Sequence, residues 1–349
     1  MEKLYDTARQ LGFNPEKIRL LDERLRHWSK AGKTPAIVAR VLRHGKLAFE
    51  NAYGPLTPDS APDSLHADSI FPICSMTKPV IASLACIMQE EGLLDLNEPV
   101  KIHIPEINDF DEDPVRWWHF LTHTSGFIAD EYDNGGKPTH KPQTQMQYHS
   151  LGFNLIKDVI EKISGASIDE YARKKLFEPL GMNDSHFIIP DVKLGRYVRR
   201  EAHFEGSEWL NNSILQSTSG GGGLKSTAAD MCRFGQMFLE KGTLDGRRVL
   251  SKASIQCLLR NHNVGLPYTL YNGGTYDASW GLGWSLGSKK DDAGMLRSPL
   301  SFEHGGFGCV KLLCDPEYSI VAAFFTVSIK DDYPYAAHFN NMVLGALDD

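Results

Sequence analysis

The sequence has few cysteines, no long hydrophobic run and no excess of positive charge, and each absence excludes a class of protein. Its 6 cysteines are scattered over 349 residues without a CxxC pair, which predicts buried thiols in a reducing compartment rather than a disulfide framework. No stretch reaches the roughly 18 apolar residues that a membrane-spanning helix needs. The opening residues, Met-Glu-Lys-Leu-Tyr-Asp, do not form a secretory signal. We therefore expect a cytoplasmic protein that does not bind a membrane.

The charge balance and the composition exclude further classes of protein. The chain has 37 Lys+Arg against 44 Asp+Glu, a net charge of −7, so it has no basic excess to neutralise phosphates and we expect no nucleic-acid partner. Hydrophobic residues make up 42% and charged residues 23%, which is typical of a globular protein and excludes disordered, collagen-like and coiled-coil classes. The length fits about two domains or one large domain.

Hydrophobic periodicity and turn residues predict strands near both ends of the chain and helices between them. Asp113-Pro114 is predicted to begin a helix as N-cap and first helical residue, and Ser167-x-x-Glu170 forms a capping box. The pattern favours one mixed sheet built from both termini, with a helical domain inserted. We expect an α/β domain from residues 1–74 and 225–349, a mainly helical domain from 75–224, and an active site where they meet. The other predicted elements are helices at 15–32, 227–241 (ended by Gly242) and 335–347, and β-hairpins at 36–49 and 310–325.

The strongest candidate for a catalytic group is the pair Ser75 and Lys78. The two residues are three positions apart at the start of an almost wholly apolar helix, so they share one face of its first turn. A serine hydroxyl needs a base to remove its proton, and a lysine in a dry site can lose its charge and act as that base. Because the helix is apolar on every side, we expect it to be buried, with Lys78 inside.

Three other motifs are weaker. Gly283-Trp-Ser285-Leu-Gly287 fits a G-x-S-x-G elbow, but a charged loop follows where a helix is needed, so Ser285 is interpreted as a strand residue. His119 and His123 have the spacing of a zinc helix without its Glu or a third ligand, so a core-facing helix end is favoured. Gly220 to Gly223 with Lys225 lacks the Gly that a phosphate loop requires before its lysine. We expect no metal, nucleotide or other cofactor.

Several motifs in chain order resemble those of the serine β-lactamase-like superfamily, in its class C branch. That branch includes β-lactamases, D-Ala-D-Ala carboxypeptidases, D-aminopeptidases, family VIII carboxylesterases and acyltransferases. The resemblance runs from about residue 35 to 330 and implies a β-lactamase/transpeptidase-like fold, with an antiparallel sheet flanked by helices and an inserted helical domain. The matching segments are Ser75-Met-Thr-Lys78, Leu121-Thr-His-Thr-Ser-Gly-Phe127, Tyr148-His-Ser-Leu-Gly-Phe-Asn-Leu-Ile156, Leu176-Phe-Glu-Pro-Leu-Gly-Met182, Gly220-Gly-Gly-Gly-Leu-Lys-Ser-Thr227, Gly281-Leu-Gly-Trp284 and His304-Gly-Gly-Phe-Gly308.

The resemblance implies a role for each site residue. Ser75 would attack the substrate carbonyl and become the acyl-enzyme. Lys78 and Tyr148 would manage the proton, and either of them could be the acylation base. The backbone N–H groups of Ser75 and Phe307 would form the oxyanion hole. Four further residues are expected to bind substrate: Ser150, His304, Gly305 and Gly306.

Two departures from the family pattern favour an ester as substrate. Ser150 stands where class C β-lactamases have an asparagine, and a hydroxyl reaches less far than an amide. His304 stands where the Lys-Thr-Gly motif has its lysine, so a substrate carboxylate would be held more weakly. We therefore expect a small-molecule ester substrate, as for a family VIII carboxylesterase. A β-lactamase, a D-amino-acid peptidase or amidase, an acyltransferase and a non-catalytic penicillin-recognising scaffold remain the alternatives.

Overall fold

The computed structural model describes residues 2–107, 110, 112–128, 138–199, 207–269, 275–287, 293–327 and 334–348. Its largest element within these residues is a six-stranded sheet with the strand order β2-β1-β12-β11-β10-β9, in which all neighbours are antiparallel. The antiparallel sheet is the one that the family resemblance implies, and the expectation of a mixed sheet is wrong. Its strands are β1 (Ile37–Arg43), β2 (Lys46–Tyr53), β9 (Ser285–Leu286), β10 (Phe302–Gly306), β11 (Val310–Asp315) and β12 (Ile320–Thr326).

Short turns explain why the sheet is antiparallel, since a parallel pair would need a long crossover. The two predicted hairpins are confirmed as β1–β2 and β11–β12. His44 and Gly45 make the first turn, with φ of 50° and 71°. The two hairpins meet at the pairing of β1 with β12, where Ile37 lies opposite Thr326. Both ends of the chain thus contribute to one sheet, as the sequence predicts.

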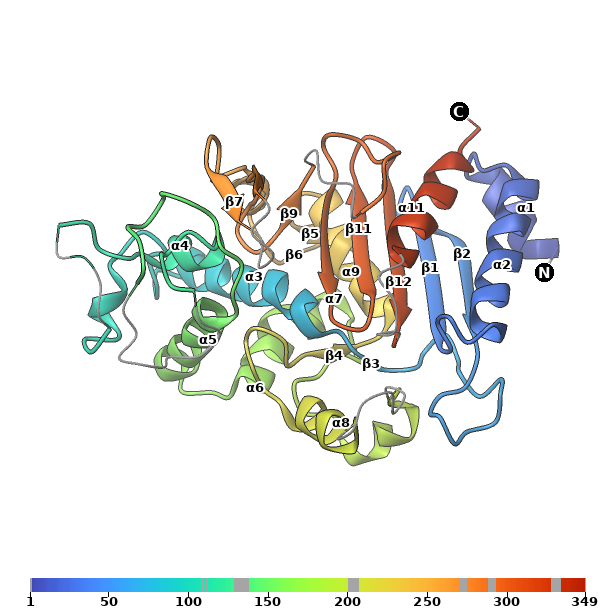
Figure 1. The fold of residues 1–349 in the computed structure, drawn as a ribbon, viewed down its shortest axis with the longest axis horizontal. Coiled ribbons are helices and arrows are strands. Elements are labelled where there is room, and N and C mark those ends of the chain that lie inside the picture. The colour runs from blue at the N-terminus through green and yellow to red at the C-terminus, as the bar shows by residue number, and fades with distance from the viewer. Residues whose placement is uncertain are drawn as a thin grey trace.

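Three helices from the two ends of the chain cover one face of the sheet: α1 (Glu2–Gln10), α2 (Pro15–Lys30) and α11 (Tyr335–Gly345). They form the right-hand side of the molecule in Figure 1, near both termini. The side chain of Asn14 caps α2 by accepting from the backbone N–H groups of Glu16 and Lys17. Trp28 of α2 contacts Tyr335 of α11, with ring centroids 5.1 Å apart. These contacts bind the two ends of the chain together in one apolar core.

The opposite face of the sheet packs against α9 (Ala228–Leu239). Thr227 caps this helix by accepting from the N–H of Asp230, and Gly242 follows it with a φ of 95°, as the sequence predicts. Helix and sheet approach closely at Gly235, where a Cβ atom would lie 2.7 Å from the Sγ atom of Cys314. The thiols of Cys232 and Cys314 are buried in this layer, and burial raises the pKa of both.

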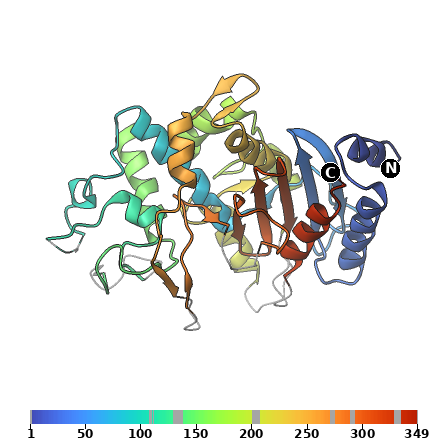
Figure 2. The ribbon, with the colours of Figure 1, turned by 90° about the horizontal axis from the view of Figure 1, so that it is seen from above.

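Helix α3 (Thr77–Glu90) runs between the sheet and the helical part of the molecule (Figures 1 and 2). All its residues from Thr77 to Met88 are buried, because apolar side chains lie on every side of it. It packs against η1 (Cys74–Met76), α5 (Leu151–Ser164) and α10 (Lys252–Leu259). The other helices here are η2 (Val100–Ile102), α4 (Trp117–Leu121), α6 (Ile168–Ala172), the π-helical η3 (Arg173–Phe177), α7 (Glu178–Leu180), η4 (Asp191–Arg196) and α8 (Ser207–Gln216).

The predicted capping box is confirmed, and the predicted helix start at Asp113-Pro114 is wrong. Ser167 and Glu170 exchange the two hydrogen bonds of the box at the start of α6. Helix α4 begins only at Trp117, because Arg116 is extended and forms an antiparallel bridge with Pro99. That bridge uses backbone that a helix starting at Pro114 would need.

Short strands connect the two parts of the molecule. β3 (Phe71–Pro72), just before η1, pairs with β4 (Lys225–Ser226), just before α9. The division into two domains at residues 74 and 224 stays a prediction. The remaining strand pairs are β5 (Thr243–Leu244) with β6 (Arg247–Arg248), and β7 (Pro267–Thr269) with β8 (Thr275–Asp277).

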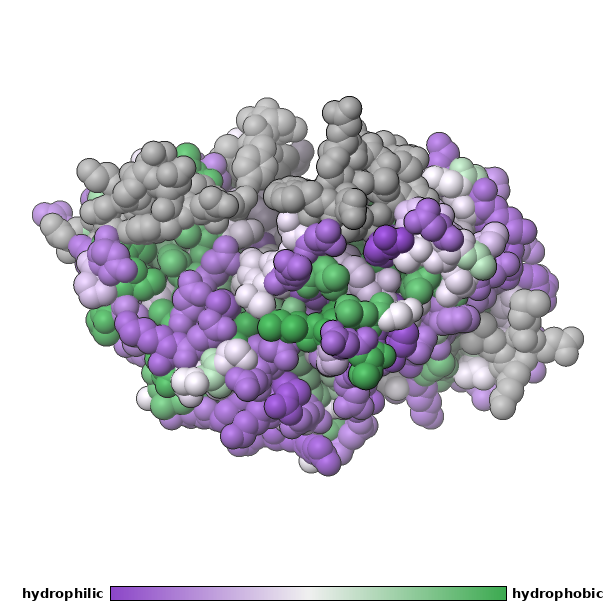
Figure 3. All heavy atoms as spheres, turned by 90° about the horizontal axis from the view of Figure 1, so that it is seen from below, coloured by the Kyte–Doolittle hydropathy of each residue, from purple (hydrophilic) through white to green (hydrophobic). Residues whose placement is uncertain are grey.

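Among the described residues, no helix combines the length and the apolar character that crossing a membrane requires. In the view from below, hydrophilic residues cover most of the outer surface and hydrophobic residues gather near its centre (Figure 3).

Candidate active site

Ser75 lies in the 3-10 turn η1, directly before the buried helix α3. The first residue of this turn, Cys74, has a φ of 48°, in the left-handed region. Thr77 fixes this turn from both sides: its hydroxyl donates to the carbonyl oxygen of Cys74 at 2.6 Å and accepts from the N–H of Leu224 at 3.0 Å. The backbone around Ser75 is therefore held by a segment far along the chain.

Lys78 is the second residue of α3 and has no exposed surface. Its Nζ atom donates to the hydroxyl oxygen of Ser75 at 3.1 Å, to the hydroxyl oxygen of Ser150 at 3.2 Å and to the carbonyl oxygen of Gly221 at 2.7 Å. An ammonium group has three N–H donors, and these three acceptors match them. The predicted burial of Lys78 and its predicted proximity to Ser75 are both found in the structure.

The carbonyl group of Gly221 is itself held in place by α5. The side-chain oxygen of Asn154 accepts from the N–H of Gly221 at 3.0 Å and from the hydroxyl of Ser219 at 2.7 Å. There is no room for a side chain here, because a Cβ atom on Gly221 would lie 2.6 Å from the Cβ of Ser150. Sequence reasoning noted the run of four glycines but missed this role, since a backbone contact leaves no signal in residue types.

Tyr148 lies just before α5, with its ring close to Lys78. The Nζ atom of Lys78 is 4.9 Å from the centroid of the Tyr148 ring, within the range of a cation–π contact. The centroid of the Tyr148 ring also lies 4.4 Å from that of the His123 ring and 5.9 Å from that of the Trp280 ring. The structure therefore places Lys78 and Tyr148, the two residues predicted to transfer the proton, next to each other.

His123 packs against the Tyr148 ring. Within the described residues, it does not belong to any group of three or more His, Cys, Asp or Glu side chains that could hold a metal ion. It is buried, has a φ of 60° and accepts from the N–H of His149 through its Nδ1 atom at 3.3 Å. Burial, together with the nearby His149, Lys78 and His304, holds its pKa well below the usual value. Burial also lowers the pKa of His119, which lies in the preceding helix α4, to about 3. Both imidazoles are therefore neutral at pH 7, and the prediction of a core-facing helix end is confirmed.

Strand β10 brings the His304-Gly-Gly segment to the same place. The ring of His304 lies 6.3 Å from that of Tyr148, between centroids, and its Nδ1 atom is 2.6 Å from the carbonyl oxygen of Gly305. A Cβ atom on Gly306 would lie 2.1 Å from the carbonyl oxygen of Ile73, so β10 runs directly against the segment that leads to Ser75. Phe307 follows at the end of the strand, with 53% of its surface exposed.

The edge of β10 is open beside these glycines. Within the described ranges, β9 pairs with β10 at Phe302 and Glu303, and this pairing ends before His304. Ser285 of the G-x-S-x-G motif is the β9 residue opposite Glu303, so its interpretation as a strand residue is confirmed. A pocket of about 200 Å³ opens here, lined by Tyr148, Tyr268, Trp280, Ser285, Glu303, His304, Gly305 and Lys311.

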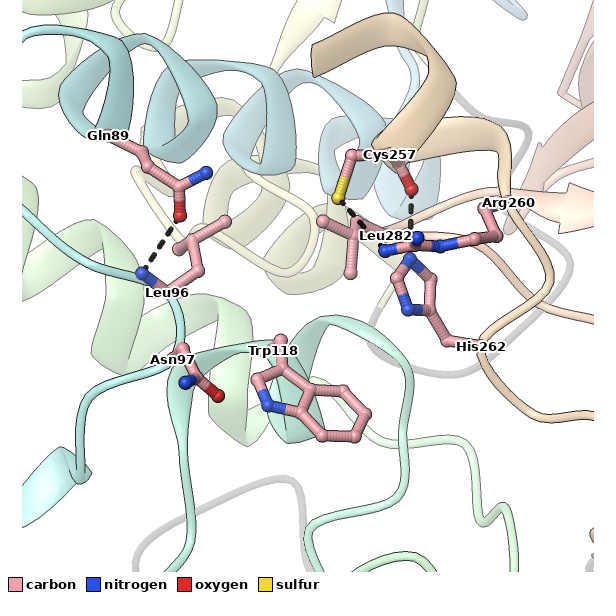
Figure 4. Close-up of a pocket in the computed structure, with 8 residues that line it drawn as sticks. All are labelled: Gln89, Leu96, Asn97, Trp118, Cys257, Arg260, His262 and Leu282. Carbon is pink, nitrogen blue, oxygen red and sulfur yellow. Dashed lines mark hydrogen bonds between the residues drawn. The ribbon is translucent and has the colours of Figure 1, made fainter. Parts of the chain in front are cut away.

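A second cavity, of about 330 Å³, lies apart from this one and shares none of its lining residues (Figure 4). Trp118 and Leu282 face it, together with the polar side chains of Asn97, Arg260 and His262. It contains none of the predicted site residues. From the sequence we expect the loop from Phe127 to Gln147 to cover the active site, and its residues 129–137 lie outside the described ranges.

Comparison with known proteins agrees with this geometry. The sequence profile of the Beta-lactamase family matches residues 21–339. Penicillin-binding protein 4 of Amycolatopsis lactamdurans is 28% identical over 245 residues, covering 63% of each chain. A solved penicillin-binding protein homolog from Caulobacter crescentus has a TM-score of 0.78 at 18% identity, covering 96% of this chain and 99% of that one. A family VIII carboxylesterase has a TM-score of 0.77 at 18% identity, covering 95% and 96%.

A serine hydroxyl that is hydrogen-bonded to a buried lysine is an arrangement that can activate serine as a nucleophile. The chain belongs to the Beta-lactamase family and is a serine hydrolase with the β-lactamase/transpeptidase-like fold.

Proposed function

We propose that this serine hydrolase acts on small esters through an acyl-enzyme. The hydroxyl oxygen of Ser75 attacks the ester carbonyl carbon, and its proton passes either to Lys78 in its uncharged amine form or to Tyr148 in its phenolate form. The alcohol then leaves with a proton returned by the same pair. Water attacks the acyl-enzyme in the second half of the reaction and releases the acid. The 3.1 Å hydrogen bond from the fully buried Lys78 to the partly buried Ser75 carries this proposal.

Hydrogen-bond donors must stabilise the negative charge that develops on the substrate's carbonyl oxygen during the attack. We assign this role to the backbone N–H groups of Ser75 and Phe307, since β10 runs against the segment before Ser75 at Gly306. Donors fixed in the backbone require no reorganisation during the reaction, which is why such groups lower the barrier strongly. The substrate would lie along the open edge of β10 between His304 and Gly306.

The contacts of Ser150 support an ester over a β-lactam or a peptide. Its hydroxyl oxygen accepts from Lys78 at 3.2 Å, so this side chain is directed to the catalytic lysine. No amide side chain stands at this position to bind the amide group that β-lactams and peptides carry. A simple ester lacks that group. The carboxylesterase with the same fold is consistent with this substrate class.

The test compares wild type with Ser75→Ala by intact-mass analysis after reaction with a phosphonate ester. We expect a single adduct on the wild type and none on the variant. An adduct on Ser75→Ala, or none on wild type, would remove Ser75 as nucleophile. Rates on a short-chain nitrophenyl ester and a chromogenic cephalosporin then decide the substrate class. Faster turnover of the cephalosporin would favour a β-lactamase, and an added alcohol that captures the acyl group would favour an acyltransferase.

A further inference from the structure

Strands β10 and β11 place a charged pair in the wall of the active-site pocket. The Nζ atom of Lys311 lies 3.0 Å from the Oε2 atom of Glu303, and their side chains are only 11% and 4% exposed. Both residues line the pocket that also contains Tyr148 and His304. Burying two charges costs solvation energy that their attraction offsets only partly. Such a pair therefore adds little stability, and its place in the pocket indicates a role in binding.

A glycine gives Lys311 access to the strand edge. Gly305 is the register partner of Lys311, and a Cβ atom on it would lie 3.2 Å from Cε and 3.8 Å from Nζ of the lysine. Gly305 does not have a positive φ, so backbone conformation alone does not require glycine here. Glycine is instead favoured by the close approach of Lys311, because the end of the lysine occupies the space next to the strand that a side chain at 305 would fill.

We infer that Lys311 binds a carboxylate of the substrate, so that the preferred substrates are esters with a carboxylate near the ester bond. The inference rests on the proposed ester hydrolysis. An ammonium has three N–H donors, so Lys311 can keep Glu303 and still bind a substrate oxygen. It supplies from the neighbouring strand the permanent positive charge that His304 lacks. The expectation of a weak carboxylate site is drawn from His304 alone, and the experiment below decides between the two.

The walls of the pocket limit what accompanies the carboxylate. The aromatic residues Tyr268 and Trp280 also line it, and its volume is about 200 Å³. A flat or short carboxylate-bearing group fits this space better than a long alkyl chain. The pocket thus combines an aromatic contact with one cationic contact.

The experiment uses two matched pairs of compounds on the full chain. The substrates are 3-acetoxybenzoate and its uncharged methyl ester, and kcat/KM is measured for each. The binding probes are 3-carboxyphenylboronic acid and phenylboronic acid, whose dissociation constants do not depend on turnover. The variants are Lys311→Met and the double variant Glu303→Gln/Lys311→Met, which removes both charges and leaves no unpaired buried carboxylate. Lys175→Met, which removes the surface ion pair with Glu91, is the control.

For wild type and the control we expect the charged compound of each pair to be preferred by about tenfold or more, the range of one charged hydrogen bond. In both Lys311 variants the preference should disappear, while the uncharged compounds change by less than about threefold. The inference would be overturned if wild type showed the same kcat/KM and affinity for the charged and uncharged compounds. It would also be overturned if the folded double variant lost kcat/KM and affinity equally for both compounds. Hydrolysis of the methyl ester in that case would leave the proposed function standing. If neither ester is turned over, the proposed function fails and the boronic acids alone decide the role of Lys311.

Discussion

The Nζ atom of Lys78 lies 2.7 Å from the carbonyl oxygen of Gly221 and 3.1 Å from the hydroxyl oxygen of Ser75. The shorter bond is to the carbonyl group of Gly221, a residue whose N–H donates to the side chain of Asn154 in α5. The lysine is therefore oriented by the helical part of the molecule and presented to a serine in the turn that follows β3. Catalysis depends on both segments being in place.

Substitution of Gly221 by alanine should disturb this geometry. The added Cβ would lie 2.6 Å from the Cβ of Ser150, so either the Gly221 carbonyl or Ser150 must shift away from Lys78. A displacement of this size costs on the order of 100-fold in rate in well-positioned sites, and we expect kcat/KM for a nitrophenyl ester to fall accordingly. Gly195→Ala is the control, because a Cβ at that position meets no atom within 4 Å. Similar rates for the two variants would show that Gly221 does not orient the lysine.

Substitution of Lys78 by methionine should remove activity without unfolding the protein. Methionine has similar length and no charge to bury, whereas loss of a general base lowers rates by roughly 10²–10⁴-fold. Lys225→Met is a matched control, since Lys225 is also fully buried and donates to the carbonyl oxygens of Phe187 and Ser217. That variant should lose stability, about 1–3 kcal/mol for each carbonyl left unpaired, and still form the phosphonate adduct. Thermal melts and intact mass separate the two effects, and a fully active Lys78→Met would exclude the lysine from the chemistry.

Tyr148→Phe should retain the ring contacts with His123 and Trp280 while losing the phenol. We expect an unchanged melting temperature and a fall in ester hydrolysis of about 10²–10⁴-fold. Tyr171→Phe, a buried tyrosine of α6, controls for loss of a phenol elsewhere. Near wild-type turnover by Tyr148→Phe would leave Lys78 as the acylation base.

The free energy of unfolding should fall on acidification from pH 6.5 toward 3 because of His119. Its pKa is about 3 in the folded protein, so the unfolded chain binds a proton in this range that the folded protein does not. One such group contributes up to about 1.4 kcal/mol per pH unit. Asp230 acts in the opposite sense, since burial raises its pKa to about 6 and its contribution is lost as the pH rises through that value.

Because the two groups oppose each other, the comparison of wild type with His119→Asn isolates the histidine. Urea denaturation at pH 7.0 and pH 5.0 should show a smaller loss of stability for the variant than for wild type. An equal or larger loss in His119→Asn would mean that the folded protein accommodates the charged imidazole.

Much of the fold and part of the site follow from local sequence patterns. The hairpins, the cap at Ser167 and the buried helix after Ser75 are encoded within short segments, so periodicity and capping residues predict them. The pairing of Ser75 with Lys78 is also local, since one helical turn separates the residues. The predicted start of α4 is wrong because Arg116 forms a β-bridge with Pro99, which is distant along the chain, and this bridge keeps Arg116 out of the helix.

The remaining contacts join distant segments through backbone or through strand register, neither of which residue types reveal. Gly221 acts through its carbonyl oxygen, and Lys311 reaches the pocket only because β11 pairs with β10 in one register. The family resemblance predicted Tyr148 and His304 because it supplies the long-range arrangement that a single sequence lacks. The roles of the individual residues stay predictions until the variants are measured.

The pairing of β1 with β12 has a consequence for synthesis of the protein. The hairpin of β1 and β2 emerges early from the ribosome, yet its inner neighbour β12 is translated near the end, with Ile37 opposite Thr326. Until then the edge of β1 is open and its apolar face lacks α11, a state that favours aggregation. Expression yield should therefore depend on chaperones that hold the nascent chain, and a truncation that removes β12 should leave an insoluble product.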